Sequence, residues 1–208
     1  MSNNHFKTVR MTQLALLIAI EAVLAFTPFG FIQIPPVSIT IMHIPVIIGA
    51  IVLGPFFGAI LGLSFGVLSM IKATFMAASP VDLLFSPFAS GYPVQSLVMC
   101  VVPRILLGVI AGYLYRFLSG KMKTSELATG ISAGIATLCH TFLVLGCLGL
   151  FFNAMALKDI FMVIIGFNGL LELGVGIVVS VAVCRPLLKY VRSHGMSASS
   201  QSVQGAKS

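Results

Sequence analysis

Long hydrophobic stretches make up most of this chain, and polar residues gather where those stretches end. The stretches cover residues 11–27, 41–53, 56–75, 94–118, 125–152 and 159–189. Of all residues, 58% are hydrophobic and 8% are charged, whereas about a quarter are charged in soluble domains. The pattern predicts an all-α membrane protein whose residues 1–192 form one domain of six transmembrane helices. The Ser-rich end, 193–208, is expected to be a disordered cytoplasmic tail.

The basic residues at the ends of the stretches indicate how the chain threads the membrane. They precede the first span (Lys7, Arg10), follow the fourth (Arg116, Lys121, Lys123) and follow the last (Arg185, Lys189, Arg192). If Gly54-Pro55 separates two helices, all three groups lie on one side, as the positive-inside rule requires. If it only kinks one helix, the middle group lies on the opposite side. We therefore expect six spans with both termini in the cytoplasm.

The first span could also be a signal peptide, because Lys7 and Arg10 precede it. Glu21 interrupts its apolar run, and further membrane segments follow it. A retained helix is therefore expected.

Three connectors, 28–40, 76–93 and 153–158, then lie on the outer side. Prolines in the first connector favour an extended hairpin over a helix. The first two connectors are long and apolar, which is typical of a lid and equally of ordinary packing at the membrane surface.

Small residues recur at helical spacing in two of the spans. Gly54, Gly58, Gly62 and Gly66 repeat every four residues, which predicts close packing between helices. Ala15 and Ala19 share one face of the first span. That face either packs within the bundle or docks a partner protein.

Arg104, His140 and Asn168 lie deep inside apolar spans, at a similar depth of about 15 Å below the outer ends of their helices. Glu172 is one turn beyond Asn168 on the same helix face. Polar residues inside a membrane are costly and typically mark a functional site. Further candidates are Thr141, beside His140, and two residues near outer helix ends, Lys72 and Asn153.

These residues have two interpretations. An Arg104–Glu172 ion pair, with His140 and Asn168 as hydrogen-bonding groups between helices, would be purely structural. A pocket for a small anion is the favoured hypothesis, because Arg104 and Lys72 outnumber Glu172 and a guanidinium binds a carboxylate through two hydrogen bonds. No role is assigned to His43.

Several other functions are not expected. There is no H-E-x-x-H motif, no G-x-S-x-G motif and no second carboxylate near Glu172, so the chain is not predicted to be an enzyme. The four cysteines lie in apolar stretches without C-x-x-C spacing, and neither a metal nor another cofactor is expected. The sequence also lacks a pattern of nucleic-acid binding and the repeats of a secondary transporter.

The stretch Ser38–Gly62 resembles the substrate-binding S components of energy-coupling factor (ECF) transporters. The matching features are the short second span, the L-G-P turn and the glycine-spaced third span. The A-x-x-x-A face of Ala15 and Ala19 matches the motif by which the family docks its coupling subunit. The segments H-I-P-V-I-I-G from His43, F-S-P-F from Phe85 and V-P-R-I-L-L-G-V around Arg104 are most similar to the pantothenate-type subgroup.

This resemblance implies a six-helix S component in a bacterial plasma membrane, with an outward pocket under the first and third outer loops. It also implies assembly with a transmembrane coupling subunit and two ATPases, and transport by toppling of the S component. No G-x-x-x-x-G-K-[ST] motif is present, so ATP hydrolysis is assigned to those partners.

Pantothenate has one carboxylate for Arg104 and Lys72, and hydroxyl and amide groups for His140, Asn168 and Glu172. The alternative ligands are a pyridoxine- or thiamine-pathway compound, riboflavin or folate. The alternative class is a membrane scaffold with a structural ion pair.

Overall fold

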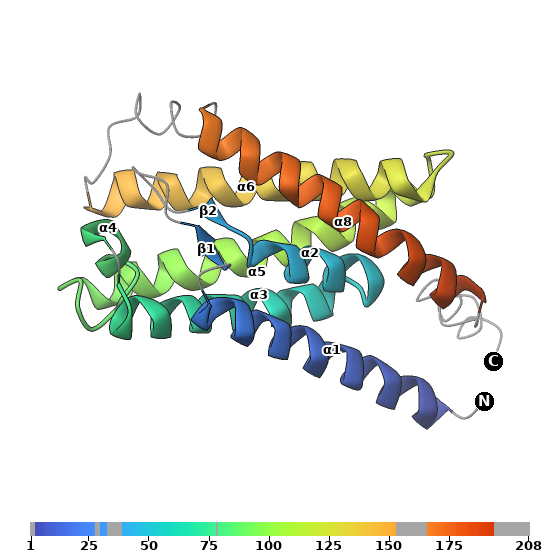
Figure 1. Ribbon diagram of the computed structural model, residues 1–208, viewed down its shortest axis with the longest axis horizontal. Coiled ribbons are helices and arrows are strands. Elements are labelled where there is room, and N and C mark those ends of the chain that lie inside the picture. The colour runs from blue at the N-terminus through green and yellow to red at the C-terminus, as the bar shows by residue number, and fades with distance from the viewer. Residues whose placement is uncertain (1–2, 28–29, 33–38, 78, 153–165, 194–208) are drawn as a thin grey trace.

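The computed structural model describes residues 3–27, 30–32, 39–77, 79–152 and 166–193, and these residues are mostly helical (Figure 1). The helices are α1 (Asn3–Phe26), α2 (His43–Val52), α3 (Pro55–Phe75), α4 (Pro80–Leu83), α5 (Pro93–Ser119), α6 (Ser125–Phe152) and α8 (Phe167–Ser193). Two short antiparallel strands, β1 (Phe31–Ile32) and β2 (Ile39–Thr40), pair before α2. The long helices lie side by side along one axis, with the start of α1 and the end of α8 at the same end.

The predicted helical class is confirmed. Five described helices, α1, α3, α5, α6 and α8, are long and apolar enough to cross a membrane, and α2 is a shorter apolar helix. The first five predicted spans agree with helices in the structure, and the extended hairpin expected in 28–40 agrees with β1 and β2. The predicted start of the sixth span at 159, the connector 153–158 and the tail 194–208 lie outside the described residues.

Gly54 separates α2 from α3. Its φ of 111° lies in a region that favours glycine, since a Cβ would clash there. Pro55 then begins α3 at a position where no helical hydrogen bond needs its missing N–H. The predicted break at Gly54-Pro55 is confirmed.

Helix α2 lies at the centre of the bundle. Every residue from His43 to Ile51 is buried, and the apolar core around α2 includes side chains of α1, α3, α5, α6 and α8. A helix of 10 residues is only about 15 Å long, too short to span a bilayer alone. Its neighbours therefore supply the surroundings that its apolar side chains need.

Glycines bring the backbones of α3 and α5 into direct contact. A Cβ on Gly62 would overlap the backbone carbonyl of Arg104, and one on Gly108 would overlap the backbone of Gly58. Gly66, one turn further along α3, makes the same kind of contact with α5. The packing predicted for the glycine row is confirmed, and α5 contributes glycines of its own.

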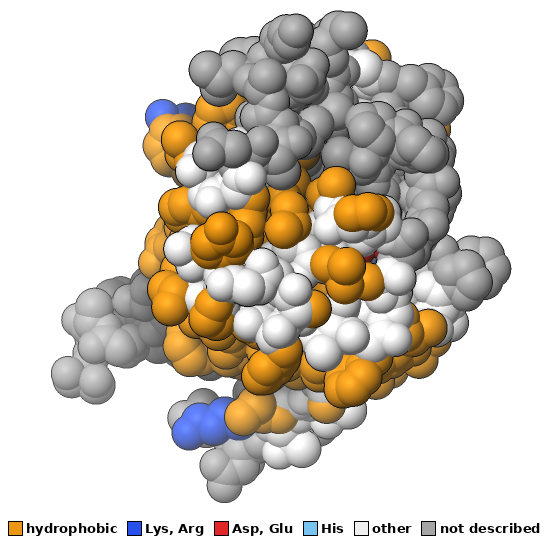
Figure 2. All heavy atoms as spheres, turned by 90° about the vertical axis from the view of Figure 1, so that its left-hand side faces the viewer, with side chains coloured by type: hydrophobic (Ala, Val, Ile, Leu, Met, Phe, Trp, Pro, Cys, Tyr) orange, Lys and Arg blue, Asp and Glu red, His pale blue; other side chains and the backbone are white. Residues whose placement is uncertain are grey.

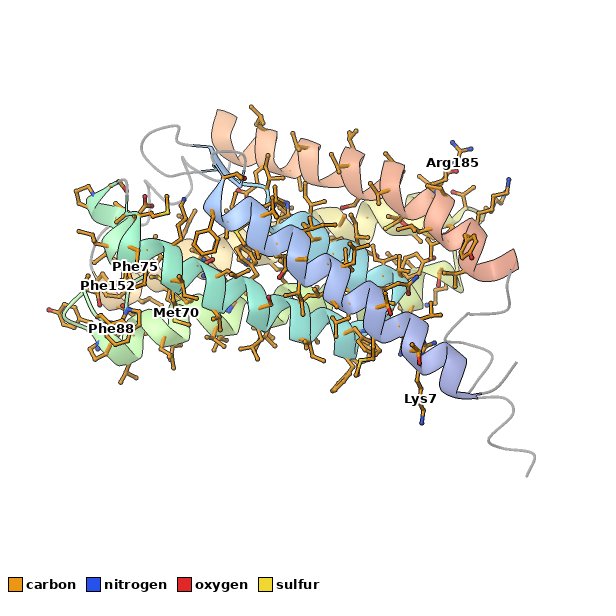
Figure 3. The ribbon with its side chains drawn as sticks, turned by 60° about the horizontal axis from the view of Figure 1, so that its bottom comes forward. Lys7, Met70, Phe75, Phe88, Phe152 and Arg185 are labelled. Atoms are coloured by element: carbon orange, nitrogen blue, oxygen red, sulfur yellow. The ribbon has the colours of Figure 1, made fainter. Side chains whose placement is uncertain are left out.

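Labelled basic and phenylalanine side chains lie at opposite ends of the bundle. Lys7 and Arg185 lie at the end where α1 starts and α8 ends, and Phe75, Phe88 and Phe152 lie at the other (Figure 3). Seen from that aromatic end, much of the described surface is hydrophobic, and its basic side chains lie only at the margin (Figure 2). This segregation matches the one-sided placement of basic residues expected from the sequence.

Helix α1 packs at the edge of the bundle, with its two sides in different surroundings. Leu14, Glu21 and Ala25 are buried against the other helices. Ala15 and Ala19 are exposed. Among the described residues, their shared face is therefore not an internal packing surface. Docking of a partner on this face stays a prediction.

We predict that Gly62→Ala destabilises the protein by about 1–3 kcal/mol, because the added methyl group must push α5 away from α3. Gly146→Ala on α6 is the matched control, since nothing lies within 4 Å of a Cβ there. Thermal unfolding in detergent measures both. Equal unfolding temperatures for the two variants would contradict the backbone contact.

Candidate functional site

Arg104 is a buried cation between two aromatic rings. Its side chain is 4% exposed, and its Cζ lies 5.4 Å from the ring centroid of Phe65 and 5.3 Å from that of Phe85. Aromatic faces attract a cation but carry no net charge, so they do not neutralise it. The Nε of Arg104 has no hydrogen-bond partner among the described residues. The guanidinium therefore keeps an unused donor.

A proline inside α5 supplies the group that holds Arg104. Pro103 has no N–H, so the carbonyl of Met99, four residues earlier, is not used by the helix ladder. Nη1 of Arg104 donates to that Met99 oxygen at 2.5 Å. Nδ1 of His140 on α6 lies 3.3 Å from the carbonyl oxygen of Pro103. Pro103 thus frees the carbonyl that positions the Arg104 guanidinium, and its own carbonyl links α5 to α6.

Phe85 reaches the site from the connector between α3 and α5. Ser96 Oγ donates to the carbonyl oxygen of Leu84 at 2.7 Å, and Cys100 Sγ donates to that of Phe85 at 3.2 Å. Both donors belong to α5. The second outer connector is therefore fastened onto α5 beside Arg104.

A second polar group joins α2 to α8. His43 is 1% exposed, and its Nδ1 lies 2.7 Å from the carbonyl oxygen of Thr40 and 3.7 Å from Oε1 of Glu172. The backbone of Thr40 also lies beside the Glu172 carboxylate. Glu172 therefore lies against the end of the hairpin and the start of α2.

The two groups form one electrostatic cluster. Arg104 interacts with Glu172 and His140, and His140 interacts with His43. Among the described residues, Glu172 contacts His43 at 3.7 Å, and no salt bridge joins Glu172 to Arg104. The structural ion pair considered from the sequence is therefore not formed as a direct contact.

Lys72 lies away from Arg104, near the aromatic end of α3. The guanidinium is held at Met99, next to Cys100, which packs on Gly66 of α3. Lys72 is six residues beyond Gly66, so its backbone lies about 9 Å further along α3. Its charge interacts with that of Asp82 in α4. The structure does not bring these two cations together.

The other predicted residues are less fully described. Thr141 is half-buried beside His140 on α6. Asn168 belongs to α8, but its side chain is not described, and Asn153 lies outside the described residues.

Glu21 is a deep carboxylate that the sequence interpretation did not count. It is fully buried, the Ser64 hydroxyl of α3 lies nearby, and neither carboxylate oxygen makes a hydrogen bond within the described part of the chain. With Glu21 included, the deep cations do not outnumber the deep carboxylates, so that argument for an anion pocket was wrong as counted. The helical spacing of Leu14, Glu21 and Ala25 is the signal that would have found it.

His43 is the other residue whose place the sequence did not reveal. It touches Glu172 and lies in the same cluster as His140. Its position at the start of a wholly apolar helix was the available signal, because a polar residue next to such a helix is buried with it.

Comparison with known proteins gives two findings. Residues 9–184 match the family described as "ECF transporter, substrate-specific component". Over 187 residues the chain is 35% identical to the pantothenic acid transporter PanT of Lactococcus lactis subsp. cremoris (strain MG1363), covering 85% of this chain and 92% of that protein.

Proposed function

The chain belongs to the family of ECF transporter substrate-specific components, and we propose that its substrate is pantothenate. It is an integral membrane protein that binds substrate for a transporter and is not an enzyme. The proposal of pantothenate is supported by the similarity to the pantothenic acid transporter of Lactococcus lactis. It is also supported by the chemistry of the site.

The observation that carries the proposal is the state of Arg104. The guanidinium is buried, has an unpartnered Nε and lies in no salt bridge of the described residues. A carboxylate bound at the Nε side of the guanidinium would gain charge-assisted hydrogen bonds. Water would not screen the attraction between the two charges in these buried surroundings. Pantothenate carries one carboxylate. The proposed site therefore matches its charge.

The uncharged part of pantothenate has two hydroxyl groups and an amide. His140 and Glu172 lie within electrostatic reach of Arg104 and are proposed to bind these groups. Asn168 and Thr141 remain proposed ligands on the same two helices. Lys72, near the outer end of α3, is assigned to the entrance of the site. Asn153, which the sequence predicts at the outer end of the fifth span, is assigned there too.

The proposed topology has six spans, with α2 as the short second one and residues 1–192 as one domain. Both termini are placed in the cytoplasm, because Lys7 and Arg185 lie at the end where α1 starts and α8 ends. The aromatic end, where Phe85 and the hairpin approach the site, then faces outward.

The chain is proposed to work with a transmembrane coupling subunit and two ATPase subunits. The exposed face of Ala15 and Ala19 suits close approach by a helix of another subunit, because small side chains let backbones come near. No nucleotide-binding motif is found in the sequence, so the energy is assigned to the ATPases.

Calorimetry on the purified protein tests the proposed substrate. Pantothenate should bind with submicromolar affinity, on the order of 8 kcal/mol or more, without ATP or metal. Pyridoxine, thiamine, riboflavin and folate serve as the comparison ligands. If folded protein binds one of these and not pantothenate, the proposed substrate is wrong while the family assignment stands.

We predict that Arg104→Ala weakens pantothenate binding by about 2–5 kcal/mol, because the carboxylate loses its charged partner in a buried site. Arg104→Lys should recover only part of the loss, since an ammonium group cannot form the paired hydrogen bonds. Calorimetry measures both variants. The exposed Arg185 at the opposite end provides the control variant Arg185→Ala, which should bind normally.

Thermal unfolding of the same samples separates binding from folding. If Arg104→Ala unfolds the protein while the surviving folded fraction binds pantothenate normally, Arg104 is structural and not a ligand.

We predict that Ala15→Trp and Ala19→Trp abolish uptake by cells while the purified variants bind pantothenate normally. A bulky ring on this face prevents close approach of a coupling helix, and the face is remote from the buried site. Ala182→Trp, at an exposed alanine of α8, is the matched control. Normal uptake by both α1 variants would show that the coupling subunit docks elsewhere.

A further inference from the structure

His43 has a buried ring nitrogen that its protein surroundings do not satisfy. Its Nδ1 lies 2.7 Å from the carbonyl oxygen of Thr40. A carbonyl only accepts, so Nδ1 carries the proton of this hydrogen bond, and in the neutral ring Nε2 is an acceptor. Nε2 has no partner among the described residues. A buried acceptor without a donor is unfavourable, so this atom calls for a donor from outside the described residues.

Thr137 places a second unsatisfied group beside the first. It is 2% exposed, and its Oγ1 has no hydrogen-bond partner in the described ranges. Both atoms face Gly176 of α8. A Cβ on that glycine would lie 2.8 Å from Nε2 of His43 and 3.5 Å from Oγ1 of Thr137. Helices α2 and α6 thus direct one polar atom each toward a point that the glycine leaves without a side chain.

This point adjoins the proposed binding site. Thr137 lies one turn from His140 on the same face of α6, toward the basic end. His43 lies 3.7 Å from Glu172 through its other ring nitrogen. A molecule held at Arg104 and His140 would therefore extend toward this pair of atoms.

Two other buried hydroxyls, those of Ser132 and Ser180, also have no partner in the described structure. A serine or threonine hydroxyl in a helix can turn toward the carbonyl oxygen of the preceding turn, so neither these serines nor Thr137 alone requires an outside partner. The imidazole of His43 has no such choice, because Nδ1 is already engaged. The demand for an external donor is therefore specific to the point over Gly176.

We propose that Nε2 of His43 and Oγ1 of Thr137 form a subsite for a hydroxyl group of the substrate. A hydroxyl donates one hydrogen bond and accepts others, so it satisfies the histidine acceptor and the threonine O–H together. The subsite rests on the proposed function, since Arg104 fixes the carboxylate end of the same molecule. An ordered water has the same hydrogen-bonding capacity, so the test separates substrate from water.

The first test compares Thr137→Val with the wild-type protein by calorimetry. The ligands are pantothenate and two analogues, each with one hydroxyl replaced by hydrogen. Thr137→Val should weaken pantothenate binding about tenfold but leave the affinity for one of the two analogues unchanged. Thr137→Ser, which keeps the hydroxyl, should restore the preference for pantothenate over that analogue. An equal effect of Thr137→Val on all three ligands, or no effect, means that the pair binds water or nothing, and overturns the subsite.

The second test uses a matched pair of glycines on α8. Gly176→Ala places a methyl group at the point that His43 and Thr137 face, and should weaken pantothenate binding at least about tenfold. Gly174→Ala is the control, because nothing lies within 4 Å of a Cβ there. Thermal unfolding checks both variants. Wild-type affinity in folded Gly176→Ala overturns the subsite, and if that variant does not fold, Thr137→Val decides.

These results are distinguishable from a failure of the proposed function. Wild-type protein that binds pantothenate, with Thr137→Val and Gly176→Ala unaltered, refutes the subsite alone. Wild-type protein that does not bind pantothenate refutes the proposed substrate and the subsite with it.

Discussion

The backbone contact between α3 and α5 is the constraint on which the site depends. At Gly62 the two helices approach so closely that the backbone of Arg104 lies against α3. One residue earlier, Pro103 releases the carbonyl of Met99, which then holds the guanidinium. In the membrane interior, an unused carbonyl and a buried cation are each unfavourable alone. Together they fix the direction of one side chain without neutralising its charge.

This arrangement explains how the guanidinium of Arg104 can be buried and still keep a donor for the proposed carboxylate. The rings of Phe65 and Phe85 enclose Arg104 and attract it, but neither removes its positive charge. Glu172 acts on Arg104 at a distance while it contacts His43 directly. A direct Arg104–Glu172 pair would compete with an anionic substrate. Because Arg104 is not paired directly with Glu172, the proposed carboxylate would reach the guanidinium without breaking an ion pair.

The sequence revealed features that depend on one helix and missed those that depend on several. Hydrophobic length predicted the spans, and Gly54-Pro55 predicted the break, because both are local properties. The depth of Arg104 followed from helix rise. The burial of Glu21 and the contact of His43 with Glu172 depend on how helices rotate against each other, which one sequence does not specify. The count of deep charges made from the sequence therefore left out Glu21, because the side of α1 that faces the other helices was not known.

Helix α2 lies between the proposed substrate site and the proposed docking face for the coupling subunit. Helix α1 turns Leu14 and Ala25 toward the core that includes α2, while its alanine face points away from the bundle. His43, the first residue of α2, belongs to the polar cluster on its other flank. Because α2 is buried throughout, any rearrangement at His43 must be accommodated by the packed core beside α1. The proposed substrate site and the proposed docking face are thus distinct surfaces joined through one short, fully enclosed helix.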